Sequence, residues 1–193
     1  MALVGLDDLH FSILTKDDST GVTYSTITPI PGAITVDMQP QSNTNTLYAD
    51  NSPFAVATAF GGVTVSLEIA ALPLEIRAKL LGHEVKDGLM VSKADDVAPY
   101  VALMFKSLKH NDSYRYVKLL KGKFNEPQET PTTKTDSPEF ATPTIEGNFV
   151  SREYDKKWAY MADTDNTNFT GANTWFDSVE TAEEEEEEED NNG

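Results

Sequence analysis

Alternating apolar and polar residues predict β-structure in the middle of the chain. Apolar residues occupy every second position from Val63 to Ile69, and Thr, Ser and Glu fill the positions between them. This period of two indicates a strand that is buried on one face. Gly61 and Gly62, directly before it, predict a turn. Related patterns predict further strands over residues 33–38, 54–60, 114–121, 147–150 and 158–162.

One predicted strand, residues 99–105, is apolar at consecutive positions rather than at alternate ones. This pattern is typical of a central strand that is covered on both faces. With it, the chain carries about eight to ten short strands, a number that favours a sandwich or a barrel. The expected fold class is mainly β, with two packed β-sheets.

A single short α-helix is well indicated from Pro73 to Leu81. Pro73 suits the start of the helix, where its missing N–H is not needed. Leu74 and Ala78 share one stripe with Leu81, and Gly82 can end the helix in the left-handed conformation. Such a helix usually covers one face or end of the sheets. A weaker pattern predicts a second helix over residues 173–179, which would present Trp175, Phe176 and Val179.

Two long stretches, Gln39–Pro53 and Asn125–Pro143, lack a regular pattern and are rich in Pro, Asn and Thr. Loops above about 12–15 residues in a compact domain are usually functional or disordered. Leu47 and Tyr48 form the only strong apolar pair of the first stretch. This pair is explained if the long inter-strand loop packs on a neighbouring copy.

Acidic residues are concentrated at the end of the chain. The 193 residues carry a formal charge of −17, and nine acids with no base lie between positions 180 and 190. Residues 1–179 therefore carry a charge of only −8. A run of like charges repels itself and has nothing apolar to bury. We therefore expect a β-domain over residues 1–179 and a disordered acidic tail over residues 180–193, although an interaction tail or an electrostatic brush is an open alternative.

Composition also excludes several classes of protein. The acidic charge argues against binding duplex DNA through its phosphates and against docking on an anionic membrane. The chain has no cysteine, which excludes disulfides, thiolate zinc sites, iron–sulfur clusters and cysteine nucleophiles. The start of the chain lacks a signal-peptide pattern, and no apolar stretch is long enough for a membrane helix, so we expect assembly in a cytoplasm.

No constellation of residues predicts catalysis. His10, His83 and His110 are far apart in the sequence and are expected to be surface or packing residues. Phosphate loops, dinucleotide fingerprints and nucleophile elbows are missing. The segment 163–168 begins like a calcium loop, but it has Asn168 where the glycine is required. We therefore expect no catalytic residue, cofactor or metal, and we expect the basic residues of the segment 115–123 to form salt bridges.

Several short runs follow one another in a specific order and spacing. They are Leu6-Asp7-Asp8-Leu9-His10, Pro31-Gly32-Ala33-Ile34, Leu47-Tyr48-Ala49-Asp50, Leu72-Pro73-Leu74-Glu75, Leu81-Gly82-His83, Asp95-Asp96-Val97-Ala98-Pro99-Tyr100-Val101-Ala102-Leu103, Tyr114-Arg115-Tyr116-Val117-Lys118-Leu119 and Lys121-Gly122-Lys123-Phe124. Through these runs, residues 3–162 resemble the major tail proteins (tail tube proteins) of long, non-contractile-tailed bacteriophages. The acidic end of the chain is not part of this resemblance.

The resemblance implies a fold and a structural role in the virion. Members have two packed β-sheets, a flanking helix and a long loop. Six copies form a ring, rings stack into a tube, and strands of neighbouring subunits join into an inner β-barrel. The tube surrounds the tape-measure protein, meets the tail terminator and distal tail proteins, and conducts DNA into the host. By this resemblance, residues 73–81 are the flanking helix. The inter-subunit loop contains Gln41, Asn43, Thr44, Leu47, Tyr48 and Asp50.

An acidic tube lumen would repel DNA phosphates and let the genome slide, whereas a basic lumen would bind it. We therefore expect acids to outnumber bases on the polar faces of the inner strands, with Glu68 and Glu146 as candidates. The alternative function is a monomeric β-sandwich binding module, an adhesin or a carbohydrate-binding domain. Electron microscopy separates the two, and deletion of residues 44–50 should abolish tubes but leave a folded monomer.

Overall fold

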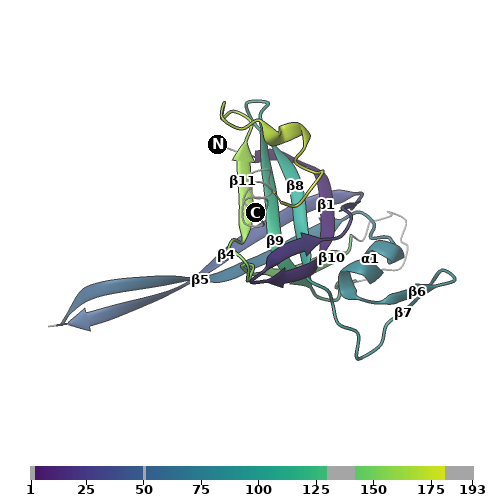
Figure 1. The fold of residues 1–193 in the computed structure, drawn as a ribbon, viewed down its shortest axis with the longest axis horizontal. Coiled ribbons are helices and arrows are strands. Elements are labelled where there is room, and N and C mark those ends of the chain that lie inside the picture. Colours follow the sequence, from purple (N-terminus) through teal and green to yellow (C-terminus); the bar gives the residue numbers. More distant parts are fainter. Residues whose placement is uncertain (1–2, 50, 130–141, 181–193) are drawn as a thin grey trace, which may run out of the picture.

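The computed structural model describes residues 3–49, 51–129 and 142–180 (Figure 1). Within these ranges the chain forms eleven strands, one α-helix and one 3-10 turn. The strands are β1 (Leu3–Asp18), β2 (Gly21–Tyr24), β3 (Thr28–Pro29), β4 (Ala33–Ala49), β5 (Ser52–Ile69), β6 (Glu84–Lys86), β7 (Leu89–Val91), β8 (Val101–Lys109), β9 (Tyr114–Phe124), β10 (Thr144–Phe149) and β11 (Ala159–Asp163). The helix α1 spans Leu74–Leu81, and the 3-10 turn spans Gly171–Asn173. The fold is mainly β, as the sequence predicts.

Nine strands belong to one large antiparallel sheet, and β6 and β7 form a separate sheet of two strands. The order in the large sheet is β2-β1-β8-β9-β10-β5-β4, with β3 beside β1 and β11 beside β9. The sheet divides at β9, where residues 115–119 pair with β11 and residues 122–124 pair with β10. Neither described sheet closes into a barrel, and the arrangement is that of a β-sandwich.

The large sheet bends so that its strands share one apolar core. The alternate residues of β5 from Val63 to Ile69 are buried and pack with apolar residues of β1, β8, β9 and β10. Leu80 and Leu81 bring α1 against the same core. Each fully buried aliphatic side chain stabilises the fold by about 1.5–3 kcal/mol. The predicted half-buried strand and the predicted flanking helix are both confirmed.

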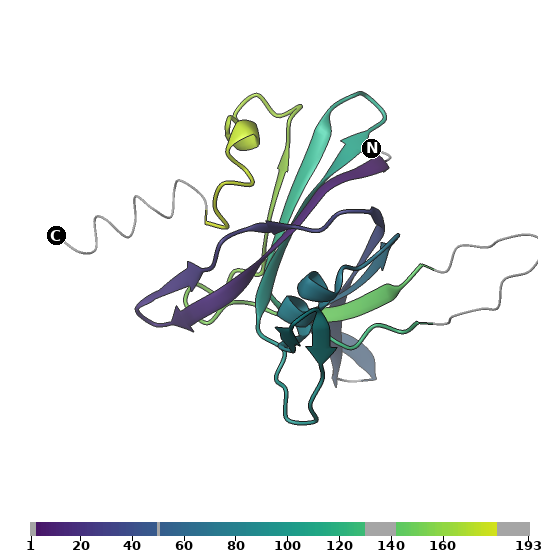
Figure 2. The same ribbon diagram turned by 90° about the vertical axis from the view of Figure 1, so that its right-hand side faces the viewer.

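A smaller apolar cluster lies on the other face of β8 and β9. Met104 and Leu120 pack there against Phe176 and Val179 of the C-terminal segment. Figure 2 shows this segment and α1 on different sides of the large sheet. Because Leu103 on the inner face and Met104 on the outer face are both fully buried, β8 is covered on both faces. This confirms the prediction from its continuous apolar pattern.

The helix α1 ends where the sequence predicts. Gly82 follows it in the left-handed conformation, with φ of +77°, and its backbone N–H bonds the carbonyl of Ala78. A Cβ atom at position 82 would lie 2.3 Å from the carbonyl oxygen of Val97. Glycine is required here both by the backbone conformation and by this close approach. No described helix has the length and apolar character needed to cross a membrane.

The prediction of an irregular loop over residues 39–53 is wrong. Residues 39–49 continue β4, and residues 52 and 53 begin β5. Pro40, which argues against a central strand, is tolerated because β4 lies at the edge of the sheet. The long loop is therefore a long β-hairpin.

Two smaller predictions are also wrong. Gly61 and Gly62 do not make a turn, because β5 runs through them and the pairing register shifts opposite this point. Residues 173–179 do not form an α-helix. Asn173 ends the 3-10 turn, residues 174–177 are turns, and Trp175 and Val179 are buried against the sheet. The acidic tract after Glu180 and residues 130–141 of the second proline-rich stretch lie outside the described residues.

Candidate assembly surfaces

The outer parts of β4 and β5 leave the body of the protein as a two-stranded hairpin (Figure 1). Its arms pair with each other from Ser42 and Phe60 to Ala49 and Ser52. The neighbouring strand β10 pairs with β5 only from Val63 to Glu68, so among the described residues the outer arms have no further strand partner. A two-stranded hairpin exposed on both faces is marginally stable in water. Contact with another surface would therefore stabilise the hairpin.

The two faces of the hairpin differ in composition. One face carries Phe54, Val56 and Phe60, whose side chains are 74%, 63% and 44% exposed. The register places Val56 opposite Thr46 and Phe60 opposite Ser42, and Phe54 lies at the register shift next to the tip. The other face carries Asn43 and Asn45 opposite Ala59 and Ala57, and its large apolar residue is Leu47, opposite Ala55 near the tip. One face offers large apolar groups for burial, and the other allows another backbone to approach closely.

Five of the six residues expected in an inter-subunit loop lie on β4, the first arm of the hairpin. Gln41, Asn43, Thr44, Leu47 and Tyr48 lie on β4, whereas Asp50 lies outside the described residues. At the base, the side-chain amide of Gln41 donates to the Thr64 hydroxyl at 2.9 Å. At the tip, Leu47 is 61% exposed and Tyr48 is 65% exposed. The base of the hairpin is thus tied to the sheet, and its tip presents apolar side chains to solvent.

The direction of the hairpin is set where it joins the body. Gly62 has φ of +114°, and a Cβ atom there would lie 2.9 Å from the carbonyl oxygen of Phe149. The register shift at this point adds a residue to β5, and such bulges bend a strand. The Phe60 ring stacks on Trp158, with 5.1 Å between ring centroids. These contacts hold the outer arms in a defined orientation.

The sequence pattern alone does not identify Phe54, Val56 and Phe60 as surface residues. Their alternation with alanine correctly predicts a strand, and an apolar strand face is normally assigned to the core of its own chain. Periodicity does not say which chain covers that face. The absence of charge from Gln39 to Ala49 was the available signal that this strand pair differs from an ordinary solvent-exposed hairpin.

Glu68 and Glu146, the predicted lumen acids, lie on one polar sheet face. Glu68 is in register with Thr144, and Glu146 is in register with Ser66, which makes the two carboxylates diagonal neighbours on β5 and β10. Asp37 of β4, also opposite Ser66, lies on the same face. The strands β4, β5 and β10 contain these three acids and no Lys or Arg. We name this surface the acidic face.

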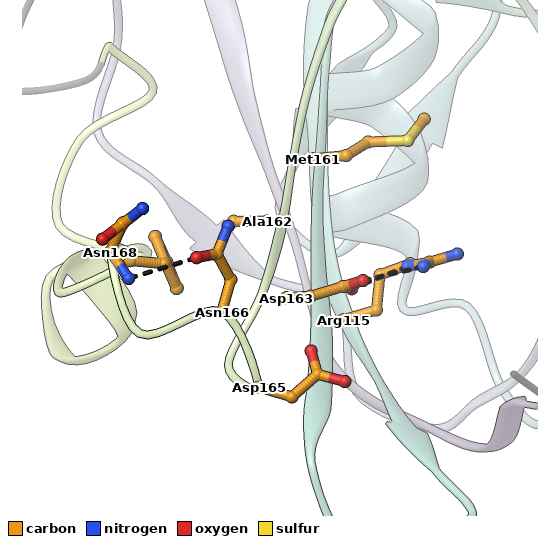
Figure 3. A pocket seen from close by; sticks show the side chains of 8 residues that line it. Arg115, Met161, Ala162, Asp163, Asp165, Asn166 and Asn168 are labelled. Atoms are coloured by element: carbon orange, nitrogen blue, oxygen red, sulfur yellow. Dashed lines mark hydrogen bonds and ion pairs between the residues drawn. The ribbon is translucent and has the colours of Figure 1, made fainter.

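The segment that begins like a calcium loop lines an open groove beside β11 (Figure 3). Arg115 donates to both carboxylate oxygens of Asp163, each at 2.8 Å, and Lys109 lies 2.8 Å from Asp163 and 2.9 Å from Asp165. Hydrogen bonds from Arg115 to Asp163 and from Lys109 to Asp165 lower the pKa of both carboxyls. The described residues contain no group of three or more acidic or histidine side chains placed to hold a metal. Asp163 and Asp165 thus form ion pairs with Arg115 and Lys109 of the same chain.

His83 is clamped between two carboxylates at the end of α1. Its Nδ1 lies 2.7 Å from an oxygen of Asp96, and its Nε2 lies 2.5 Å from an oxygen of Glu126. Because ionised carboxylates only accept hydrogen bonds, both ring nitrogens must donate, as in the charged imidazolium. The bonds to Asp96 and Glu126 raise the pKa of His83. Arg77 of α1 also pairs with Glu126, so the cluster ties the helix to the segments before β8 and after β9.

We expect His83→Gln to weaken the fold more at about pH 6 than at about pH 8. The pKa of His83 is raised above its unfolded value of about 6.5, so its contribution is full below that value and is lost as the pH rises through the folded pKa. Hydrogen bonds to charged groups stabilise by about 1.5–3 kcal/mol, which sets the expected loss at the lower pH. Urea unfolding of both proteins at the two pH values measures the difference.

His110→Gln is the matched control for this experiment. His110 is exposed and lies in the turn between β8 and β9, so the free energy of unfolding should change by less than about 0.5 kcal/mol at either pH. An equal loss for His83→Gln at both pH values would show that its charge is not the source of the stabilisation.

The described residues form a β-sandwich that carries a projecting uncharged hairpin and an acidic sheet face. A family model described as phage tail tube protein matches residues 1–185. The chain therefore belongs to the phage tail tube protein family. Among curated proteins, a search returns no matching sequence.

Family membership confirms the resemblance that the sequence motifs carry. It assigns the chain a structural role in the tail tube of a virion. It also implies that copies of the chain self-assemble into a tube and meet other components of the tail.

Proposed function

We propose that this protein assembles into hexameric rings that stack to form the phage tail tube. The observation that carries the proposal is the β4–β5 hairpin, whose apolar side chains are exposed and whose arms pair only with each other among the described residues. Exposed apolar strands of this kind invite association, and assembly across subunits removes their exposed edges. A ring needs contacts in which one surface meets a different surface of the next copy, and a projecting hairpin supplies one such surface.

The acidic face is proposed to line the lumen of this tube. Its three carboxylates, Asp37, Glu68 and Glu146, would repel the phosphates of passing DNA, while bases at these positions would retain the genome. Glu68 accepts a hydrogen bond from the Thr142 hydroxyl at 2.6 Å, which fixes the position of its charge. The tube would in this way conduct genomic DNA into the host without binding it.

In the proposed role the tube would contact several other tail proteins. During assembly in the host cytoplasm the tube would enclose the tape-measure protein, and its two ends would meet the tail terminator and the distal tail proteins. Residues 1–179 would make the tube domain, and residues 180–193 would form a separate acidic tail, because a run of like charges repels itself. The role is structural and non-enzymatic, with no cofactor and no membrane.

Removing the hairpin tests the proposal. A deletion of residues 44–50 would remove most of one arm but leave the other, β5, arm. The cleaner variant removes residues 44–58 and joins Asn43 to Ala59 through an Asn-Gly turn. These two residues face each other in register, and the removed residues lie outside the core cluster. We expect the purified wild type at raised concentration to form tubes or rings with a central channel in electron micrographs. The variant should remain a folded monomer.

Two results would contradict this expectation. Tubes formed by the hairpin-deleted variant would exclude the hairpin as an assembly surface. A wild-type protein that stays monomeric at every concentration, even with tail initiator proteins present, would instead favour a monomeric adhesin or carbohydrate-binding module. Circular dichroism of the variant separates lost assembly from lost folding.

A further inference from the structure

Exposed apolar side chains gather at two ends of the molecule. Of sixteen large apolar residues that are exposed in the described part of the chain, five lie on the hairpin and five lie around α1, β6 and β7. We name four of the second group the α1–β7 surface: Leu74, Leu89, Val91 and Val97. The fifth, Val85, is opposite Met90 and lies on the other face of the small sheet. Figure 1 places the hairpin tip and β6–β7 at opposite ends of the longest axis. The two groups therefore cannot cover each other within one copy.

The α1–β7 surface is built on a small sheet that pairs only with itself. The strands β6 and β7 have no other strand partner among the described residues. Leu89 is 66% exposed, and Val97, in the segment before β8, is 72% exposed. The register places Leu89 opposite Lys86 and Val91 opposite Glu84, so the two apolar residues share one face. A self-paired hairpin with an exposed apolar face gains stability when another chain covers it.

This surface is held in place before any partner arrives. Gly82 lies against the carbonyl of Val97, and His83 bonds Asp96, which fixes the start of β6 relative to the segment that carries Val97. The Asp96 carboxylate also accepts from the backbone N–H of Lys93 at 2.8 Å, just after β7. A preorganised surface binds at a lower entropic cost than one that must first be ordered.

Charge favours contact between these two surfaces. Residues 1–179 carry a formal charge of −8, so two copies repel each other over most of their area. The segment 38–67, which contains the hairpin, has a single charged residue, Asp50. The segment 84–93 has two acids and two bases and is neutral overall. Contact between a nearly uncharged arm and a neutral surface buries apolar area with little repulsion.

We infer that the α1–β7 surface of one copy receives the hairpin tip of a second copy, with Tyr48 and Phe54 packing on Leu89 and Val97. This inference rests on the proposed tube function and names the partner surface of the hairpin. The contact joins opposite ends of the molecule and is heterologous, so it propagates from copy to copy instead of closing a two-fold dimer.

Site-specific cross-linking tests the inference, because the chain has no cysteine of its own. Tyr48→Cys protein and Leu89→Cys protein are mixed, assembled at raised concentration and treated with a short bismaleimide. The matched control replaces Leu89→Cys with Met161→Cys, since Met161 is 52% exposed but lies on β11. We expect the 48–89 mixture to give cross-linked dimers at least about tenfold more abundantly than the 48–161 mixture, because a docked pair has a high effective concentration.

The outcomes separate this inference from the proposed function. If tubes form but the 48–89 pair cross-links no more than the 48–161 pair, the inference is overturned while the tube function stands. If the wild type forms no assembly, the tube function itself fails. As a second readout, Leu89→Asp should abolish tubes while Met161→Asp keeps them, and tubes formed by Leu89→Asp protein would also overturn the inference.

Discussion

Replacing Phe149 with alanine is expected to lower the free energy of unfolding by about 3–5 kcal/mol, the usual loss for a buried phenylalanine. Phe149 is fully buried on β10 and lies directly opposite Gly122 of β9. Two positions along the same strand pair, Phe124 lies opposite Gly147, and the two rings meet edge to face at 5.7 Å. Each ring thus covers a glycine of the neighbouring strand, and chemical denaturation of the monomer measures what the Phe149 ring contributes.

The pairing of Phe149 with Gly122 also predicts how a substitution at Gly122 changes the free energy of unfolding. A Cβ atom at position 122 would lie 2.4 Å from the Phe149 ring, so Gly122→Ala alone should cost about 1–3 kcal/mol by overpacking. In the Phe149→Ala background the same change should cost little, because the ring is gone. The double-mutant cycle should therefore show a coupling of about 1–3 kcal/mol. Additive effects would mean that the sheet relaxes around the new methyl group.

Gly5→Ala provides the control for this cycle. Gly5 lies in β1, and a Cβ atom there would meet its nearest neighbour, the Cβ of Leu108, at an ordinary 3.7 Å. This change should alter the free energy of unfolding by less than about 0.5 kcal/mol, in the Phe149→Ala background as well as in the wild type.

Arg152→Met is expected to cost about 3–5 kcal/mol, because it leaves a largely buried carboxylate without its main cation. Arg152 is fully buried and donates to Asp155 and, at 3.0 Å, to the Tyr160 hydroxyl. Burial alone would raise the pKa of Asp155, but hydrogen bonds from Arg152 and from the Lys157 backbone hold it below its usual value. Urea unfolding of the monomer at neutral pH measures the loss.

Lys157→Met is the matched control for Arg152→Met. Lys157 also pairs with Asp155, at 3.6 Å, but its side chain is 43% exposed and its ion pair is screened by water. Its removal should cost less than about 1 kcal/mol. Equal losses for the two variants would show that burial does not strengthen the Arg152 pair.

The elements that sequence patterns predict well are those whose burial follows a simple period. The alternation from Val63 to Ile69, the continuous apolar run 101–105 and the helix before Gly82 appear in the structure as predicted. By contrast, β1 escaped prediction although it spans sixteen residues. Its alternation is interrupted where Asp8 adopts a positive φ of 52° and the register with β8 shifts between Asp7 and His10. A bulge of this kind moves the later side chains to the opposite face of the strand. The alternation of apolar and polar residues along β1 is therefore interrupted and cannot be recognised in the sequence.

Buried charged residues were the second class that patterns could not identify. Lys109, Lys118 and Arg152 look like surface residues in the sequence, yet all three are buried. Lys118 donates to the carbonyl of Ser178 at 2.8 Å and lies over the ring of Trp175. These partners are 57 to 60 positions away along the chain, so only the folded topology brings them together.

For the candidate surfaces, the chemistry can be read from the order of the residues, whereas their placement depends on how the strands pair. The near absence of charge from residue 38 to residue 67 and the acids at positions 37, 68 and 146 are properties of the sequence. Strand pairing decided that the first segment projects as a hairpin and that the three acids share one face. The physical reason is that a local pattern fixes which side of a strand is apolar, whereas long-range pairing fixes what stands opposite that side.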